Sequence, residues 1–394
     1  MMPSGAGATR NENHPHRGAD AHQPEGGRNL DSPFGMRGSA RAPTPRIEFC
    51  RAGDEEELAA FDRRRGSAPS TAEYWRWKYF DNPAGPACVA AARVGEEIVG
   101  TLGFLPVRMR VHAQEVVATQ QVDVAIMAEY RGGGIYFQLA HAIIEEGAKR
   151  GITFGFGFAT EQTRALSVDF LGFDLVGPIH RLAKVLDYGH YAGALLGRRL
   201  AGMVRRVTAP AHGRKPRRSL PLAGNIAPVD RFDERFDRLA ANLIQAPIMV
   251  IRDAAYLNWR YADCPTVAYG RYAARTEATV SGFVVFHTYE ADGVVRGIID
   301  ELLCSPDDPD AVERLLSAAL SDLAADGAVN AICWLPAWHP LANRLRALGF
   351  RVREARNELI VLRNKTTGLE FEHLTEERNW YYTHGDSDFH VRSA

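Results

Sequence analysis

The sequence predicts an α/β protein built from two copies of one domain, for three reasons. A chain of 394 residues is long enough for two or three domains. Runs with the two-residue period of strands alternate with runs of helical period, both in residues 46–187 and in residues 231–394. A phrase that begins Trp-Lys-Tyr at residue 77 returns as Trp-Arg-Tyr at residue 259, which indicates an internal repeat.

The composition excludes several classes of protein. Lys and Arg number 47 against 48 Asp and Glu, and a formal net charge of −1 gives no reason to expect a specific nucleic-acid partner. No apolar run reaches the roughly 18 residues of a membrane span, and the N-terminus lacks the apolar core of a signal peptide. Five cysteines without a Cys-x-x-Cys pair favour reduced thiols over disulfides or a zinc ribbon. We therefore expect a cytoplasmic protein without a metal.

Residues 1–45 are predicted to be a disordered N-terminal tail. They contain seven Gly and six Pro but no Ile or Val. Such a segment buries too little apolar surface to offset the entropy lost on ordering. Its three histidines are expected to be solvated rather than to bind a metal.

The first domain, residues 46–187, is predicted to start with a short strand at 46–50. A helix with an acidic first turn follows, where the helix dipole favours negative charge. The β-rich runs 89–94 and 98–104 are separated by a short turn that contains Gly, which predicts a hairpin.

The second half of this domain is predicted to alternate strands and helices. A strand at 116–127 leads into three successive glycines, and residues 135–150 have the helical period. Gly151 fits a helix C-cap. A strand at 152–158 and a helix at 164–171 complete the order.

Residues 188–230 are predicted to link the two domains. From 188 to 229 the chain carries eight Lys and Arg and no acidic residue. Residues 191–207 fit an amphipathic basic helix, and the following stretch is rich in Pro and Arg. We expect a solvated linker, with weak association with a membrane surface as the alternative.

The second domain, residues 231–394, is predicted to repeat the first. Besides the Trp phrase, the helix ending Leu-Gly-Phe occurs at 171–173 and again at 348–350. Both halves have the same order of strands and helices between these anchors. A repeat of this length indicates two copies of one domain rather than a solenoid of short units.

The glycine-rich turn that starts at Arg131 carries the strongest chemical signal. Gly132, Gly133 and Gly134 allow a tight turn without Cβ atoms near a ligand. The backbone N–H groups at the start of the following helix converge at its positive end, and Arg131 adds a fixed charge. The turn predicts a site for a phosphate or pyrophosphate, although it is neither the dinucleotide fingerprint nor a Walker loop.

Together with the elements around it, this turn resembles the coenzyme A loop of the GNAT superfamily of N-acetyltransferases, which reads Arg/Gln-x-x-Gly-x-Gly/Ala. Arg131 and Gly134 match the first and fourth positions, and Tyr136 stands at the sixth, where a small residue is usual. The resemblance covers residues 46–187 and, more faintly, 231–394. It implies a central mixed β-sheet flanked by helices in each domain, and acetyl-CoA as the acyl donor.

The resemblance also implies how the donor is held. The first helical residues, Ile135 and Tyr136, belong with the glycines to the pyrophosphate site. The strand before the loop is typically bulged in this superfamily. Its backbone N–H groups, here at Val124 and Ile126, are expected to bind the thioester oxygen as an oxyanion site.

A second signature of the superfamily, Asn-x-x-Ser/Ala, precedes the Gly-Phe helix ending. Thr160 and Thr163 stand at its Asn and Ser/Ala positions, and Thr160 is expected to donate a hydrogen bond to the pantetheine arm. Many members use a Tyr in this helix as general acid toward the leaving thiolate. That position is Ser167 here, which leaves the role vacant.

The paired copies resemble the tandem-GNAT bacterial subgroup, as do the phrases at 252–261 and 380–388. In the second copy the glycines are replaced by acidic residues, namely Asp307, Asp308 and Asp310. These carboxylates repel a pyrophosphate. We therefore expect the first copy to bind the donor, and the second copy to shape the acceptor pocket or to act as a structural partner.

Acetyl transfer to an amine also needs a base that removes a proton from the acceptor ammonium. Asp123 is the first candidate, because it lies on the strand that leads into the glycine loop. Burial is expected to raise its pKa. Weaker candidates are Glu161, His180, Asp300, Asp386 and Asp388. Cys304 is the one cysteine that we consider as a nucleophile.

The sequence thus predicts an acetyl-CoA-dependent N-acetyltransferase. Its acceptor is an amine of a small molecule, sugar or envelope precursor that attacks the thioester directly in a ternary complex. Two alternatives stay open: an aminoacyltransferase of the peptidoglycan type, which takes aminoacyl-tRNA, and a non-catalytic coenzyme A-binding scaffold in polysaccharide or envelope biosynthesis. Neither the acceptor's identity nor the oligomeric state follows from the sequence.

Overall fold

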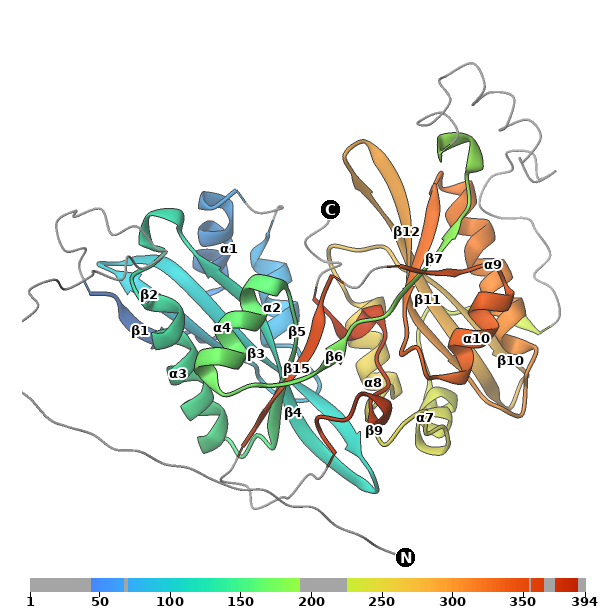
Figure 1. Ribbon diagram of the computed structural model, residues 1–394, viewed down its shortest axis with the longest axis horizontal. Coiled ribbons are helices and arrows are strands. Elements are labelled where there is room, and N and C mark those ends of the chain that lie inside the picture. Colours follow the sequence, from blue (N-terminus) through green and yellow to red (C-terminus); the bar gives the residue numbers. More distant parts are fainter. Residues whose placement is uncertain (1–43, 67–69, 192–224, 354–355, 365–372, 389–394) are drawn as a thin grey trace, which may run out of the picture. The chain divides into compact units, whose positions relative to one another are not determined.

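The computed structural model describes residues 44–66, 70–191, 225–353, 356–364 and 373–388 (Figure 1). Residues 1–43 of the predicted N-terminal tail and residues 192–224 of the predicted basic linker lie outside these ranges.

The described elements of the first copy follow the predicted order. They are β1 (Arg46–Phe49), α1 (Glu55–Arg64), α2 (Ala72–Tyr79), β2 (Cys88–Val94), β3 (Glu97–Val111), β4 (Gln114–Ile126), η1 (Ala128–Tyr130), α3 (Ile135–Lys149), β5 (Phe154–Ala159), α4 (Glu161–Leu171), β6 (Asp174–Pro178) and β7 (Arg181–Val185). Helix α2 was not predicted. It begins after Thr71, whose side chain accepts a hydrogen bond from the Tyr74 backbone N–H.

The second copy repeats this order. Its elements are β8 (Ile226–Pro228), α7 (Glu234–Asn242), β9 (Ile248–Val250), α8 (Ala254–Leu257), η2 (Asn258–Ala262), β10 (Gly270–Arg275), β11 (Val280–Ala291), β12 (Val294–Cys304), α9 (Ala311–Ala325), β13 (Asn330–Trp334), α10 (Pro340–Ala347), β14 (Arg351–Arg353), β15 (Glu358–Arg363), η3 (Glu377–Asn379) and η4 (His384–Asp386).

Each copy is organised around a mixed β-sheet, which confirms the predicted α/β fold. The first sheet has the order β1-β2-β3-β4-β5-β15-β6, with β9 also paired to β3, and the second has the order β14-β7-β13-β12-β11-β10-β8. The pairs β4–β5 and β12–β13 are parallel, whereas the other pairs are antiparallel.

The two copies exchange strands. β15 belongs to the second half of the chain, but it lies between β5 and β6 of the first sheet, where Leu359 faces Phe158. β7 belongs to the first half of the chain, but it lies between β13 and β14 of the second sheet, where Leu182 faces Cys333. Each sheet is therefore completed by a strand that belongs to the other half of the chain.

Helices cover both faces of the first sheet. Val89 and Ala91 of β2 belong to a core cluster with α1 and α2 residues, whereas Cys88 and Ala90 belong to a cluster with α3. This alternation follows from the two-residue period of a strand. Consequently α3 and α4 share one face of the sheet (Figure 1).

The repeated Trp phrase brings the two copies together. Trp77 Nε1 donates to the Trp259 carbonyl at 2.6 Å, and Trp259 Nε1 donates to the Trp77 carbonyl at 2.8 Å. The two rings stack with centroids 5.4 Å apart. Both side chains are buried in one core cluster, which fits a structural role for these aromatics.

No helix in the described ranges is long and apolar enough to span a membrane.

Candidate functional site

Strand β4 contains the bulge that the resemblance implies. The β3–β4 register shifts between Thr101 and Gly103, so that Asp123 and Val124 together face one residue of β3. Asp123 has a φ of 53°, in the left-handed region that few residues other than Gly, Asn and Asp adopt. The bulge therefore bends the end of β4 at the point where the donor's carbonyl is expected.

Strands β4 and β5 diverge at this bulge. Across the described chain they pair only at Thr119 and Gln120 of β4, although β4 continues to Ile126. Because the ladder has ended, the backbone groups of Val124 and Ile126 do not bind β5. These are the groups that the sequence assigns to the oxyanion site.

The glycine loop leads into an uncapped helix. Gly132 and Gly134 have φ values of 81° and 76°, and a Cβ atom at either position would have no neighbour within 4 Å. Gly134 is the N-cap of α3 and provides no side-chain hydrogen bond to the first turn. Among the described residues, no side chain therefore caps the first turn of α3 at its positive end.

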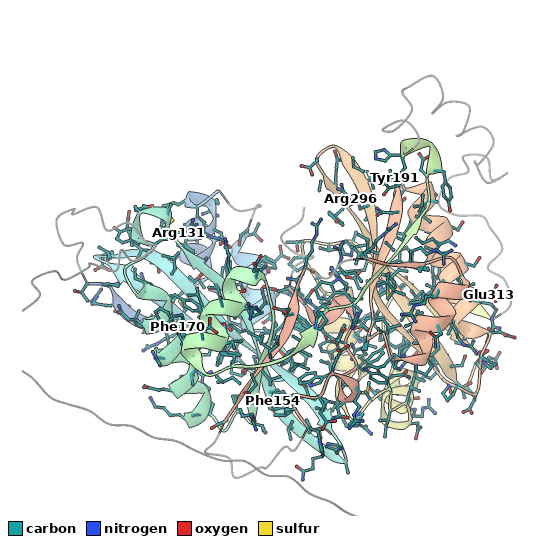
Figure 2. The ribbon with its side chains drawn as sticks, in the orientation of Figure 1. Arg131, Phe154, Phe170, Tyr191, Arg296 and Glu313 are labelled. Carbon is teal, nitrogen blue, oxygen red and sulfur yellow. The ribbon has the colours of Figure 1, made fainter. Side chains whose placement is uncertain are left out.

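Arg131 lies beside this helix end with an exposed side chain (Figure 2). Its Nε donates to the Ile126 carbonyl at 3.2 Å, which connects the loop to the end of β4. The structure therefore brings together the predicted residues of the loop and the strand: Val124, Ile126, Arg131, Gly132, Gly133, Gly134, Ile135 and Tyr136. Their geometry suits an extended ligand with an anionic end.

Tyr136 and Ser167 form one buried contact. The two hydroxyl oxygens lie 3.0 Å apart, and both side chains are buried between α3 and α4. The sequence showed these positions as two separate departures from the superfamily pattern. In the structure, the Tyr136 phenol from α3 reaches the α4 position where the superfamily usually has a Tyr.

Thr160 and Thr163 cap α4 reciprocally. The Thr160 hydroxyl accepts from the Thr163 backbone N–H at 3.4 Å, and the Thr163 hydroxyl accepts from the Thr160 backbone N–H at 2.9 Å. The two hydroxyl oxygens also lie 3.1 Å apart, at the exposed start of this helix.

The Asp123 carboxylate lies in a buried cluster. Lys78 Nζ is 2.7 Å from an Asp123 oxygen, and the Tyr79 hydroxyl donates to the same oxygen. Lys78 also lies 3.5 Å from Asp388, whose side chain is 16% exposed. The Asp123 carboxylate thus lies in the interior with a cation and a hydroxyl as partners.

The internal repeat in the sequence already marks the position of Lys78. Lys78 and Arg260 occupy the same place in the repeated Trp-Lys/Arg-Tyr phrase, directly after Trp77 and Trp259. Both side chains are buried, and both contact the C-terminal segment 380–388.

The second copy has a bulge at the corresponding place. The β11–β12 register shifts so that Asp300 is the extra residue of β12. His287 Nδ1 and His384 Nδ1 lie 2.7 Å and 3.3 Å from its carboxylate oxygens. Although burial acts in the opposite direction, these two histidines hold the pKa of Asp300 below its usual value. Burial lowers the pKa of His384.

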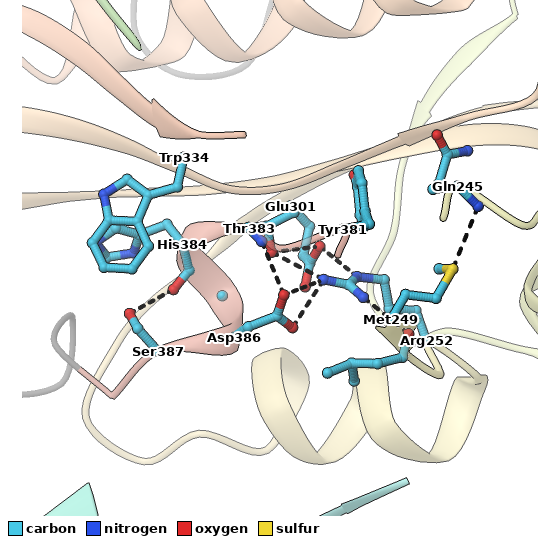
Figure 3. A network of polar contacts seen from close by, with 12 residues as sticks. Gln245, Met249, Arg252, Glu301, Trp334, Tyr381, Thr383, His384, Asp386 and Ser387 are labelled. Atoms are coloured by element: carbon cyan, nitrogen blue, oxygen red, sulfur yellow. Dashed lines mark hydrogen bonds and ion pairs between the residues drawn. The ribbon is translucent and has the colours of Figure 1, made fainter. Parts of the chain in front are cut away.

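A second buried network surrounds Arg252 (Figure 3). Arg252 binds Glu301 at 2.8 Å and Asp386 at 2.7 Å, and Thr383 donates to Glu301. Burial raises the pKa of Glu301 to about 7. Asp386 is thus the partner of a buried arginine.

The remaining candidates have defined surroundings. Glu161 is the exposed first residue of α4. His180 Nε2 lies 2.7 Å from Glu377. Cys304 is buried, and burial followed by the charge of Asp308 raises the pKa of its thiol to about 12, which disfavours the nucleophilic thiolate. Within the described ranges, no three or more His, Cys, Asp or Glu side chains are grouped to hold a metal ion.

A carboxylate with its own partners lies near the start of α9 in the second copy. Asp308 accepts hydrogen bonds from the Ser281 hydroxyl at 2.7 Å and from Arg314 at 2.9 Å. Although burial acts in the opposite direction, these bonds lower the pKa of Asp308. An anion of the chain itself thus occupies the region that is open at the start of α3.

Comparison with known proteins identifies relatives of this fold. Residues 51–169 match the family described as acetyltransferase (GNAT) domain. No curated protein matches the chain.

Solved structures match most of the chain at low identity. A probable N-acyltransferase from Enterococcus faecalis has 14% identity and a TM-score of 0.57, over 83% of this chain and 74% of that one. A GCN5-related N-acetyltransferase from Anabaena variabilis has 14% identity and a TM-score of 0.53, over 80% and 72%. Saccharomyces cerevisiae N-myristoyltransferase with bound myristoyl-CoA has 12% identity and a TM-score of 0.52, over 84% of each chain. At these identities the likeness concerns the fold.

Proposed function

Because residues 51–169 form a GNAT domain and the chain thereby belongs to the GNAT superfamily, we propose that it transfers an acyl group from a coenzyme A thioester to an amine. The observation that carries this proposal is the open start of α3 beside the diverging end of β4. One of the similar structures contains myristoyl-CoA, which supports an acyl-CoA donor in this fold. We propose acetyl-CoA as the donor.

In this proposal the first copy holds the donor. The pyrophosphate binds the N–H groups of Gly133, Gly134 and the first turn of α3, beside the Arg131 charge. The pantetheine arm follows the end of β4 past Thr160. The thioester oxygen accepts hydrogen bonds from the backbone at Val124 and Ile126, where β5 does not compete for them.

The chemical step is direct aminolysis. The acceptor nitrogen attacks the thioester carbon, the C–N bond forms, and the C–S bond breaks. Asp123 takes a proton from the acceptor nitrogen, and Lys78 compensates its charge in the resting state. The Tyr136 phenol, positioned by Ser167, donates a proton to the departing sulfur.

Donor binding and turnover test the proposal separately. Calorimetry with coenzyme A, acetyl-CoA and longer acyl-CoAs measures the affinity and stoichiometry of each compound. The comparison identifies the acyl chain length that the protein prefers. Arg131→Glu is expected to weaken acetyl-CoA binding by about 1–3 kcal/mol, through a lost charge-assisted contact and added repulsion. Asp308→Lys, a charge reversal in the second copy, is the matched control and should leave binding unchanged. Equal losses at both positions would contradict the assignment of the donor to the first copy.

One observation favours a second candidate, a coenzyme A-binding scaffold without turnover. The Asp123 carboxylate already has two partners, Lys78 and Tyr79, so it is not free to meet an acceptor without rearrangement. Release of free thiol from acetyl-CoA in the presence of an amine panel separates the two candidates. A scaffold binds the donor but releases no thiol above the rate without protein.

A further inference from the structure

Two segments of the chain cross from one sheet to the other side by side. The first joins β6 to β7 and the second joins β14 to β15, so they run in opposite directions (Figure 1). The Ile179 backbone N–H donates to the Asn357 carbonyl at 2.8 Å, which holds the two segments together. Each segment has an arginine close to this contact, Arg181 on the first and Arg356 on the second.

A third arginine lies opposite the first. In the pairing of β14 with β7, Arg353 and Arg181 are direct partners. The side chains of such antiparallel partners lie on one face of the sheet with Cβ atoms about 4.5–5.5 Å apart, and like charges in this position are destabilising. Arg353 and Arg356 are exposed and Arg181 is half-buried, so a ligand can reach this arginine cluster from solvent.

The arginine cluster is not compensated by carboxylates. Within the described ranges, none of the three guanidinium groups forms an ion pair or a hydrogen bond. Burial is the largest cause that lowers the pKa of Arg181, and the charge of Arg356 lowers it further. Cations that lie close together without an anion favour an anionic ligand, and a guanidinium suits a phosphate because it binds two of its oxygens at once.

The arginine cluster borders the edge of the first sheet at which acyl transfer is proposed. The residue two places after Arg356 pairs with Ala159, the last residue of β5. On the other side, Arg181 pairs with Trp334, the last residue of β13. The centroids of the Trp334 and Phe158 rings lie 5.6 Å apart. The carboxyl ends of β5 and β13 thus come together beside the arginines.

We propose that the arginine cluster binds a phosphate group of the acceptor, so that the acceptor is a phosphorylated amine. The pantetheine arm is proposed to pass Thr160, directly after β5, which places the donor at the same edge as the cluster. An acceptor that spans this edge holds its phosphate on the arginines and its amine at the thioester. This inference rests on the proposed function for the identity of the acceptor, but the phosphate site itself does not.

Phosphate binding is measured first without a donor, by calorimetry with sodium pyrophosphate. Every protein in this series also carries Arg131→Glu, so that the glycine loop does not contribute. Arg353→Gln and Arg356→Gln should each weaken pyrophosphate binding by about tenfold, because each removes charge-assisted hydrogen bonds. Arg238→Gln removes an exposed guanidinium of α7 and is the matched control, which should bind like its parent. Both site residues are exposed, so we expect their variants to fold.

Acceptor use is measured next by thiol release from acetyl-CoA, without the Arg131 change. The acceptors are ethanolamine with phosphoethanolamine, and glucosamine with glucosamine 6-phosphate, two pairs that differ only in the phosphate. The wild type should prefer the phosphorylated amine by about 10- to 100-fold in kcat/KM. Arg353→Gln and Arg356→Gln should lose most of that preference, while their acetyl-CoA affinity and their rate with the unphosphorylated amine stay unchanged.

The outcomes separate the two proposals. Equal pyrophosphate affinity of the site variants and the control would overturn the phosphate site. Equal kcat/KM for phosphorylated and unphosphorylated amines would overturn its role in acceptor selection, while the transferase function would stand. If pyrophosphate binding depends on Arg353 and Arg356 but none of the four amines releases thiol, the phosphate site stands. Its role toward an acceptor then fails, together with the proposed transfer to such amines.

Discussion

The two copies place a helix directly after a bulged strand, but the start of that helix differs between them. In the first copy, Gly134 is the N-cap of α3 and no side chain caps the first turn, and a Cβ atom at Gly134 would meet nothing within 4 Å. In the second copy, the Asp308 carboxylate lies at the start of α9 and binds Ser281 and Arg314. Neither helix start receives a side-chain cap, but the second copy has a carboxylate beside its helix start where the first copy has glycines.

The space beside the bulge also differs between the copies, because part of the chain occupies it in the second copy. Beyond Ile299 the pairing of β12 with β13 ends in the described chain, and the C-terminal segment 380–388 lies against β12. A Cβ atom at Gly385 would stand 1.9 Å from the Tyr261 hydroxyl and 3.0 Å from the Asp300 carbonyl. The C-terminal segment therefore fills the region of the second copy that corresponds to the proposed donor site of the first.

The largest expected effect tests whether the two bulge carboxylates differ in role. Asp123→Asn should lower turnover by roughly 10²–10⁴-fold and leave acetyl-CoA affinity intact, because the amide cannot accept the acceptor's proton. Asp300→Asn, its counterpart in the second copy, should change turnover per folded molecule very little. Steady-state thiol release and calorimetry check both variants. Near-normal turnover of Asp123→Asn across pH 6–9 would show that another group is the base, and Asp388→Asn then tests the C-terminal segment.

The next effect follows from moving the second copy's carboxylate into the first. Gly133→Asp places an anion at the start of α3 and should weaken acetyl-CoA binding by about 10- to 100-fold. Gly133 suits this change because its Cβ would meet only the Tyr130 carbonyl, at 3.6 Å. Gly133→Ala is the steric control. If Ala and Asp weaken binding equally in calorimetry, the glycine provides space and not an open anion site.

A smaller effect is expected from the hydroxyl pair between α3 and α4. Tyr136→Phe should lower turnover by roughly tenfold. The loss is larger when a general acid protonates a poor leaving group, but a thiolate whose thiol has a pKa of about 8.5 leaves readily without one. Tyr130→Phe, in η1 just before the loop, is the control. An unchanged rate for Tyr136→Phe at saturating substrate would assign the Tyr136–Ser167 contact to packing alone.

The smallest effect concerns pH and belongs to the second copy. Burial lowers the pKa of His384, so below about pH 6.5 the folded protein binds fewer protons at this residue than the unfolded chain does. His384 therefore subtracts stability as the pH falls through that range. His384→Asn should lose less free energy of unfolding than the wild type between about pH 7 and pH 5, measured by urea unfolding.

Glu301 affects the pH dependence of stability in the opposite direction, because its pKa is raised to about 7. The wild type and His384→Asn both contain Glu301, so it does not account for a difference between them. Parallel pH profiles for the wild type and His384→Asn would contradict a neutral, buried His384.

The sequence by itself determined the features that depend on local pattern. The order of strands and helices follows from periods of two and 3.6 residues, which act over a few neighbours. The glycine loop after Arg131, the acidic replacement around Asp308 and the internal repeat are also visible in the printed residues. These features were sufficient to predict two α/β copies and to favour one of them for the donor.

Only the tertiary structure decided which distant residues meet. The periodicity of β7 and β15 does not reveal that each completes the other copy's sheet, because strand pairing is set by packing over the whole domain. Tyr136 and Ser167 read as two unrelated departures until α3 and α4 pack side by side. The repeated phrase does not show that Lys78 is buried beside Asp123. The physical reason is common to all three: the contact energy comes from burial and charge pairing across space, and spacing along the chain does not record it.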